Sequence, residues 1–307
     1  MKKKTVALFL AAALTTAMLG GCGNGNGQVQ GNEAAGQDTG ADETQDAADG
    51  VTEEGADSTT DAGAAGVVYK VGIVQFVDDA SLNQIEASIE KELDAKAAEL
   101  GVTFDYGDYT YNGQADSTVL NQIATELVAS EVDVIVPIAT PAAMIMQNAT
   151  EENQIPVVFS AVSDPVGAGL VASMEAPGSN ITGTSDALNT EAVLELILAA
   201  DPDIKKVGLL YNKSEDASKA PVEAVKSYCE AKGIEVVEKT GTNNDEISLA
   251  ADALISSGAE AVFTPTDNTV MTAELAIYEK FIEAGVPHYG GADSFALNGA
   301  FLGYGVN

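Results

Sequence analysis

The sequence has no arginine and no tryptophan, and it contains only one histidine and two cysteines. Because a bidentate guanidinium clamp needs arginine, a ligand carboxylate has to be held in another way. So few histidines and cysteines do not build a transition-metal site, and we expect neither a metal nor a cofactor. The 14 lysines against 47 acidic residues give a net charge of −33, which argues against nucleic acid and anionic lipid surfaces as partners.

The same shortage argues against catalysis. His288 lies in a strand-like run, where a packing residue is favoured over a general base. No glycine-rich nucleotide loop follows the first expected strand, in which Gly72 stands alone. Cys229 follows Val222 and Val225 at helical spacing, which is typical of a thiol in a core. We therefore predict a binding protein that is not an enzyme.

Three lysines precede an apolar run over residues 5–18, which predicts a secretory signal peptide over residues 1–21. The run is shorter than the roughly 20 residues that span a bilayer. It ends in Leu-Gly-Gly-Cys22, which resembles a bacterial lipobox. That resemblance implies a diacylglycerol and palmitate on Cys22, and hence a membrane anchor on the extracytoplasmic face. The alternative is a secreted protein whose cysteine is unmodified.

Residues 22–66 form an acidic segment that begins at this cysteine. They include no basic residue and almost no large apolar side chain. Such a composition does not bury enough apolar surface to fold, and its like charges repel one another. We predict a disordered linker that holds a folded domain away from the membrane.

From residue 67 onward, short apolar runs alternate with longer amphipathic stretches, which is typical of parallel sheets with crossover helices. We predict an α/β protein of two lobes, over residues 67–185 and 186–290, with 291–307 beginning a return segment between them. A single βα barrel is the alternative. Strands are expected over 69–76, 102–109, 132–138, 156–160, 181–184, 206–211, 234–239, 261–265 and 286–289. Helices are expected over 81–100, 118–130, 141–151, 217–232, 245–257 and 269–284.

In open parallel sheets the ligand crevice lies at the carboxyl ends of the strands, so the residues that follow each strand are candidates for the site. Most of them are small, hydroxylated or acidic. The candidates are Gln75, Phe76, Thr140, Pro141, Ala142, Ser160, Ser163, Asp164, Asp186, Tyr211, Asn212, Thr266, Asp267, Asn268 and Asp293.

Two groups of candidates suggest a zwitterionic ligand. Thr140 followed by Pro141 is a strong helix start, whose free N–H groups suit a carboxylate, although Thr140 alone is equally suited to capping its helix. Asp186, Asp267 and Asp293 suit an ammonium group, and each is equally suited to a turn or an N-cap. We expect Asp267→Ala and Thr140→Ala to weaken ligand binding and to leave the melting temperature nearly unchanged.

Six blocks of sequence together resemble the substrate-binding lipoproteins of ABC importers for tryptophan, tyrosine and similar aromatic amino acids. The blocks are residues 71–77, 138–143, 158–167, 177–186, 207–212 and 265–270. The resemblance implies a type I periplasmic-binding-protein fold that closes over one ligand, an ABC permease as partner, and a monomer. It adds Ser185 to the site and makes Phe76 a candidate for stacking on an aromatic ligand, with a core position as the alternative.

Two departures from the family pattern leave the ligand open. After the first strand, members of the family have Glu-His-Pro-Ala-Leu-Asp, whereas residues 78–83 read Asp-Asp-Ala-Ser-Leu-Asn. Members also continue beyond the position of Asn307 through a further helix, so we expect a truncated chain. Our hypothesis is an extracytoplasmic receptor that delivers an aromatic amino acid to a permease. The alternatives are a sensor or adhesin with the same fold, or a receptor for a non-aromatic solute.

Overall fold

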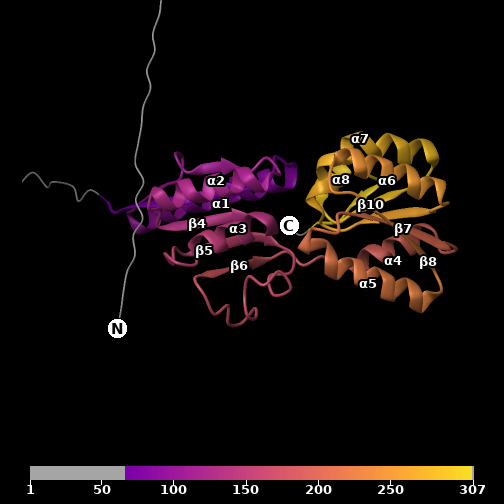
Figure 1. Cartoon of the computed structure of the whole chain (residues 1–307), viewed down its shortest axis with the longest axis horizontal. Coiled ribbons are helices and arrows are strands. Elements are labelled where there is room, and N and C mark those ends of the chain that lie inside the picture. Colours follow the sequence, from indigo (N-terminus) through magenta and orange to yellow (C-terminus); the bar gives the residue numbers. More distant parts are fainter. Residues whose placement is uncertain (1–65, 306–307) are drawn as a thin grey trace, which may run out of the picture. The chain divides into compact units, whose positions relative to one another are not determined.

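The computed structural model describes residues 66–305, which form two separate sheets of parallel strands flanked by helices (Figure 1). The predicted α/β class is confirmed, and the single-barrel alternative is wrong because neither sheet closes on itself. The predicted signal peptide, the Cys22 anchor and residues 22–65 of the linker lie outside the described residues. No helix in the described part of the chain has the length and apolar character needed to cross a membrane.

The first sheet has the strand order β2-β1-β4-β5-β6, and β3 pairs with β1 beyond the end of β2. We call this sheet and its helices the first lobe. Its strands are β1 (Val68–Gln75), β2 (Thr103–Asp105), β3 (Thr110–Asn112), β4 (Val134–Ile138), β5 (Val157–Val162) and β6 (Ile181–Ser185), and its helices are α1 (Ala80–Leu100), α2 (Ser117–Ala129) and α3 (Thr140–Thr150). The single strand expected over 102–109 is wrong. The chain turns there, with Tyr109 N donating to Tyr106 O, and it pairs with β1 twice, on either side of the turn.

The second sheet has the order β11-β10-β9-β7-β8, and we call it and its helices the second lobe. Its strands are β7 (Lys206–Tyr211), β8 (Glu235–Thr240), β9 (Ala261–Thr264), β10 (His288–Gly290) and β11 (Leu302–Gly303), and its helices are α4 (Thr190–Ala200), α5 (Asp216–Lys232), α6 (Asn244–Ser256), α7 (Asn268–Ala284) and α8 (Asp293–Leu297). Sequence reasoning missed α4 and α8. The first of these is an ordinary amphipathic helix, capped by Asn189 and burying Val193, Leu194 and Ile197.

The two sheets have the same topology. In the first lobe β1 lies between β4 and the edge formed by β2 and β3, and in the second β7 lies between β9 and β8, so the strand order reverses beside β1 and beside β7. Ligands of open α/β sheets bind outside the carboxyl ends of the strands at such a reversal. The topology therefore places one half of a ligand site in each lobe.

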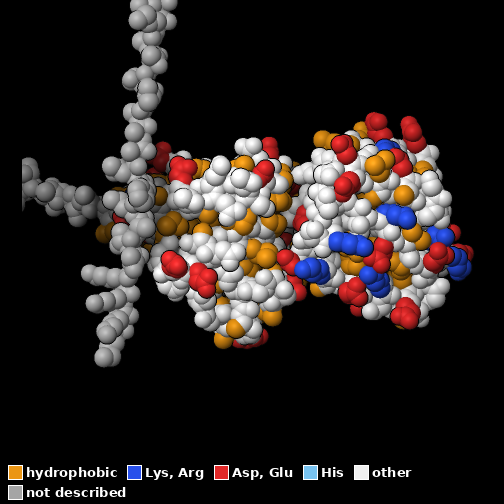
Figure 2. All heavy atoms as spheres, viewed as in Figure 1, with side chains coloured by type: hydrophobic (Ala, Val, Ile, Leu, Met, Phe, Trp, Pro, Cys, Tyr) orange, Lys and Arg blue, Asp and Glu red, His pale blue; other side chains and the backbone are white. Residues whose placement is uncertain are grey.

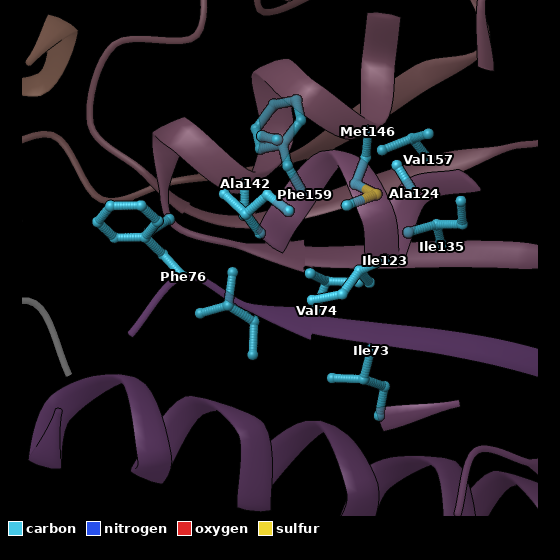
Figure 3. Packing of buried hydrophobic residues seen from close by; sticks show 14 of the residues in the cluster. Ile73, Val74, Phe76, Ile123, Ala124, Ile135, Ala142, Met146, Val157 and Phe159 are labelled. Atoms are coloured by element: carbon cyan, nitrogen blue, oxygen red, sulfur yellow. The ribbon is translucent and has the colours of Figure 1, made fainter. Parts of the chain in front are cut away.

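The core of the first lobe lies on both faces of its sheet. Figure 3 shows Ile73 and Val74 on opposite faces of β1, with Val74 directed toward Ile123 of α2. On one face α1 packs against β1, β2, β4 and β5, whereas α2 and α3 pack together on the other. The α1 face is incompletely covered by the described elements, because Val158 on β5 is 40% exposed. The second lobe has two core clusters, one beneath α6 and α7 and one beneath α4 and α5.

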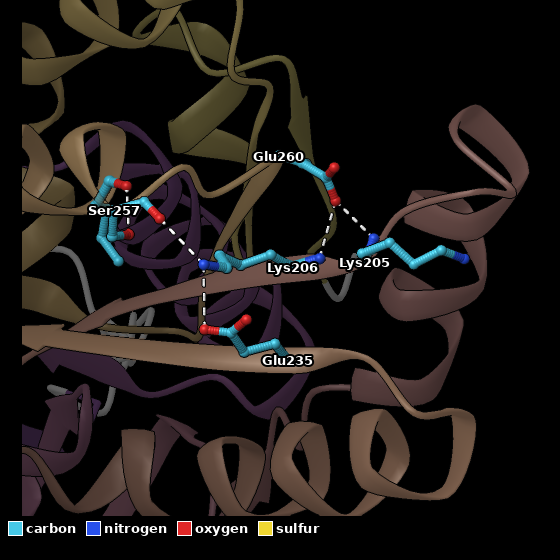
Figure 4. A network of polar contacts seen from close by, with 6 residues as sticks. Lys205, Lys206, Glu235, Ser257 and Glu260 are labelled. Atoms are coloured by element: carbon cyan, nitrogen blue, oxygen red, sulfur yellow. Dashed lines mark hydrogen bonds and ion pairs between the residues drawn. The ribbon is translucent and has the colours of Figure 1, made fainter.

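Polar contacts hold the amino end of β7, which is opposite to the carboxyl end where a ligand is expected. Glu260 accepts hydrogen bonds from the backbone N of Lys205 and of Lys206, at 2.5 and 2.9 Å (Figure 4). The Lys206 Nζ donates to Ser257 O at 3.1 Å and pairs with Glu235 at 3.1 Å. On the face shown in Figure 2, lysine side chains lie on the second lobe, whereas acidic side chains lie on both lobes. The Lys206 ammonium group is therefore paired with a carboxylate of its own lobe, whereas Lys205 contacts Glu260 through its backbone.

Candidate functional site

A cavity of about 760 Å³ lies at the carboxyl ends of the strands and has walls from both lobes. In the first lobe it is walled by α1 and by the segments after β4, β5 and β6, and in the second by the segments after β9 and β10. Of the predicted site residues, the structure brings together here Thr140, Ser160, Ser163, Ser185, Asp186, Thr266, Asn268 and Asp293. A second cavity, of about 580 Å³, lies beside His288 and Phe301, and no predicted site residue lines it.

The N-terminus of α3 forms one polar end of the larger cavity. The N-cap residue is Ala139, so the expectation that Thr140 caps this helix is wrong. Ala139 has φ 81° and ψ 152° and makes no side-chain capping bond. The first N–H groups of α3 are therefore left without a cap, and Pro141 in the first turn has no N–H to satisfy. Thr140 is 3% exposed, and its hydroxyl Oγ1 has no hydrogen-bond partner among the described residues. A helix N-terminus with a free hydroxyl suits an anionic group.

Asp186 supplies a group of the opposite kind. It follows β6, and its Oδ1 is buried without a hydrogen-bond partner among the described residues. Burial raises the pKa of this carboxyl, while a hydrogen bond from the Ser163 side chain acts in the other direction. A buried carboxylate oxygen without a donor is unfavourable, because it has lost its water. An ammonium or N–H group of a ligand would supply the missing donor.

Asp267, which we expected to contact an ammonium group, does not line the cavity. It is fully buried as the N-cap residue of α7, and its Oδ1 accepts a hydrogen bond from Val270 N at 3.0 Å. Its Oδ2 accepts from Asn212 N at 2.8 Å and from Ser218 Oγ at 2.7 Å. Burial and the nearby Glu215 carboxylate raise the pKa of Asp267 to about 7. The expected crevice of three aspartates is thus reduced to Asp186 and Asp293 on the cavity wall.

The other predicted residues that do not line the cavity have their own partners in the fold. Asn212 Nδ2 donates to Thr269, Gln75 Nε2 donates to Asn83 Oδ1, Asp164 Oδ1 accepts from Gly167 N, and Tyr211 donates to Glu238 at 2.6 Å. Phe76 is 8% exposed and belongs to the core of the first lobe, as does Ala142 (Figure 3). Pro141 also does not line the cavity. The structure therefore supports the core alternative for Phe76 and gives no support to its stacking on a ligand.

Sequence reasoning missed one wall of the cavity, the face of α1 formed by Leu82, Ile85, Ile89 and Leu93. Their helical spacing was a signal that could have identified this face. Sequence reasoning singled out residues 78–83 instead, which include the residues just before the helix. Of these, Asp79 caps α1 by accepting from Ser81 N and Leu82 N. Asp78 and Asp79 do not line the cavity, whereas Ser81 and Leu82 do.

The single histidine belongs to the interior of the second lobe. His288 is 1% exposed, its Nδ1 lies 3.0 Å from Glu274 Oε1, and its Nε2 lies 2.8 Å from Thr264 Oγ1. The rings of Phe281 and Phe295 lie beside it. Cys229 is buried as well, and burial raises the pKa of its thiol. Both side chains occupy packing positions away from the larger cavity.

Two doubly wound parallel sheets with a shared cavity at their carboxyl ends define a two-lobed ligand-binding protein. A family model described as "ABC transporter substrate binding protein" matches residues 70–307. The chain belongs to this family, whose members bind the substrate of an ABC transporter outside the cytoplasm.

Three relatives carry further information. The "Tyrosine-binding protein" of Clostridioides difficile (strain R20291) is 30% identical over 307 residues, which is 99% of this chain and 79% of that protein. An ABC domain from Streptococcus pneumonia, solved in complex with L-Trp, is 33% identical with a TM-score of 0.69, over 76% of this chain and 77% of that chain. A ligand-free, open substrate-binding protein with adhesive properties from Clostridium difficile is 32% identical with a TM-score of 0.54, over the same shares.

Proposed function

We propose that this chain captures an aromatic amino acid between its lobes and delivers it to the permease of an ABC importer. The observation that carries the proposal is a pair of buried polar atoms in one cavity, Thr140 Oγ1 and Asp186 Oδ1, neither of which has a partner among the described residues. The first lies at a helix N-terminus and suits a carboxylate, whereas the second suits an ammonium group. An α-amino acid carries both groups.

The apolar wall of the same cavity supports an aromatic side chain. Leu82, Ile85 and Val158 line it, and about 760 Å³ lies within the range of small-molecule sites. The relatives that bind tyrosine and L-Trp support the same ligand class. The aromatic ring would then pack on aliphatic side chains of α1 and β5.

The proposal includes a lipid anchor at Cys22 and a monomeric domain on a flexible acidic linker. The sequence Leu-Gly-Gly-Cys22 after a short apolar run supports the anchor, and the absence of basic residues from 23–66 supports an extended linker. An anchored domain stays concentrated near the permease that receives its ligand. Mass spectrometry of the membrane-extracted protein would show the added lipid mass on the N-terminal peptide.

Calorimetric titration with L-tyrosine, L-tryptophan and L-phenylalanine tests the ligand, with L-leucine as the comparison. We expect Thr140→Val and Asp186→Asn each to weaken binding by about tenfold or more, because each leaves a charged group of the ligand without its partner. Thr150→Val is the matched control on the same helix. Its hydroxyl donates to Met146 O and accepts from Asn180, away from the cavity, so only stability should fall.

Equal affinity in wild type and both variants would refute the assignment of Thr140 to the ligand carboxylate and of Asp186 to the ligand ammonium group. Native mass spectrometry of the purified protein addresses the alternative of an adhesin. A bound small molecule at one per chain supports capture, whereas an empty cavity together with no binding of any of the amino acids supports the alternative.

A further inference from the structure

Glu215 was not among the predicted site residues, yet its carboxylate holds together the wall of the cavity in the second lobe. It is the N-cap residue of α5, but it makes no side-chain capping bond within its own helix. Its side chain reaches instead to the N-terminus of α7. There Glu215 Oε1 accepts from Thr269 N and from Thr269 Oγ1, both at 2.8 Å. One helix therefore caps the other.

The second oxygen of Glu215 fixes the orientation of Asn268. Glu215 Oε2 accepts from Asn268 N at 3.1 Å and from Asn268 Nδ2 at 2.8 Å. A carboxylate only accepts hydrogen bonds, so the NH₂ end of the Asn268 amide has to point toward it. The other end, Oδ1, then points away from Glu215. Because Asn268 lines the cavity, this side chain presents a hydrogen-bond acceptor to a ligand.

The remaining contacts around Glu215 make this orientation rigid. Asp267 accepts from Ser218 of α5 at 2.7 Å, which is the reciprocal of the contact from Glu215 to α7. Asn212 Nδ2 donates to Thr269 Oγ1 at 2.9 Å and so fastens the end of β7 to the same cluster. Both carboxylates lie at helix N-termini, where the dipole favours negative charge. The Asn268 amide is therefore held by two helices and a strand.

The neighbouring Thr266 side chain is also a hydrogen-bond acceptor on this wall. Thr266 Oγ1 donates to Gly291 O at 3.0 Å, so its lone pairs remain for a ligand. Thr266 and Asn268 both line the cavity. The wall of the second lobe is thus rich in acceptors, in contrast to the donors at the N-terminus of α3.

We infer that Glu215 is a positioning residue for specificity. By fixing the Asn268 amide it makes this wall accept hydrogen bonds, and the site selects ligands that bring an N–H or O–H donor to that wall in addition to the ammonium group that Asp186 accepts. The inference rests on the proposed capture of an amino acid, because it assigns the wall that receives this further donor. Glu215 itself does not line the cavity, so it acts through Asn268.

The experiment exchanges the hydrogen-bond acceptor and donor of the Glu215–Asn268 pair in the full chain. In Glu215→Gln the new NH₂ group requires an acceptor, and Asn268 can supply one only by turning its own NH₂ into the cavity. We expect affinity for L-tyrosine and L-tryptophan to fall by about tenfold or more. In the double variant Glu215→Gln with Asn268→Asp, one carboxylate oxygen accepts from Gln and the other faces the ligand. Affinity should then return to within a few-fold of wild type.

A second readout needs no ligand. The side-chain NH₂ protons of Asn268, followed by ¹⁵N–¹H NMR, should show hydrogen bonding to a carboxylate in wild type and lose it in Glu215→Gln. Lys280→Met is the control, since it removes the hydrogen bonds from Lys280 Nζ to Ser248 O and to Asp252 Oδ2, which join α7 to α6 and involve neither Glu215 nor Asn268. It should lower the melting temperature and leave affinity unchanged.

Three outcomes would overturn the inference: unchanged affinity in a folded Glu215→Gln variant, a double variant that binds no better than Glu215→Gln alone, or an Asn268 amide signal that Glu215→Gln does not alter. If wild type binds none of the amino acids, the proposed function fails, and the amide signal still decides whether Glu215 orients Asn268.

Discussion

The two halves of the cavity are built in opposite ways. In the first lobe, the cavity-lining residues Thr140 and Asp186 each have a buried oxygen, Oγ1 and Oδ1, without a partner among the described residues. In the second lobe, Asn268 and its neighbours are held by Glu215 and Asp267, whose four oxygens accept hydrogen bonds. The first half has buried polar atoms without partners, whereas the second has side chains that neighbouring carboxylates hold in place.

The backbone is strained at the cavity in the first lobe and unstrained at the equivalent position in the second lobe. Ala139, at the start of α3, has φ 81° and ψ 152°, a combination that is otherwise almost confined to glycine and costs roughly 1–3 kcal/mol. Asp267, at the equivalent position before α7, has φ −106° and ψ 112°, which is ordinary extended backbone. Strain and unsatisfied groups thus lie together in the first lobe. This is the arrangement expected where a fold gives up stability in order to bind a ligand.

The largest expected effect comes from breaking the satisfied half. Asp267→Ala leaves Asn212 N, Val270 N and the Ser218 hydroxyl without their acceptor, so we expect unfolding to become easier by about 3 kcal/mol or more. This replaces the expectation, drawn from sequence, that the variant would keep its melting temperature. Chemical denaturation followed by circular dichroism measures the change.

Asp293→Ala is the comparison for that variant, because Asp293 is exposed on the cavity wall and should cost less than about 0.5 kcal/mol. Similar losses in the two variants would mean that the Asp267 contacts do not contribute more to stability than an exposed acid does.

Much of this comparison was accessible from sequence. The positions of the strands identified the carboxyl ends, and Thr140, Asp186, Thr266 and Asn268 were selected because they follow strands. Sequence did not distinguish a side chain that faces the cavity from one that faces a neighbouring helix. Asp267 and Asn268 are adjacent, and both cap helices well, yet only Asn268 lines the cavity.

Glu215 was missed for a related reason. The sequence suggests only that Glu215 is the N-cap residue of its own helix, α5. Its contact with the first turn of α7 depends on the side-by-side pairing of β7 and β9, which local sequence patterns do not specify. The apolar face of α1 was missed although its spacing was visible. Only the structure shows that no other described helix or strand fully covers this face.

A smaller effect is expected from relieving the strain in the first half. Ala139→Gly removes the Cβ from a backbone conformation that glycine adopts freely, and we expect the protein to gain about 1 kcal/mol of stability. Thermal unfolding should show a higher melting temperature. The control is Ala142→Gly in the first turn of the same helix, where the conformation is regular and glycine should cost about 1 kcal/mol. A loss of stability in both variants would show that φ 81° at Ala139 is not strained.

The smallest expected effect is a dependence of affinity on pH, and it bears on Asp186 alone. Burial raises the pKa of this carboxyl in the absence of ligand, so as pH falls toward that raised value a larger fraction is protonated and unable to accept from an ammonium group. Affinity for L-tyrosine should therefore fall as pH is lowered from 7, by a few-fold and by no more than the tenfold per pH unit that one proton allows.

The same shift has the opposite sign for the stability of the unliganded protein. A raised carboxyl pKa favours the folded state at low pH, so this contribution is lost as pH rises through the raised pKa. Asp186→Asn should remove both dependences, and calorimetry at several pH values compares the slopes of the two proteins. Equal slopes would assign the proton to another group, and Asp267 is the first candidate because burial and the nearby Glu215 carboxylate raise its pKa to about 7.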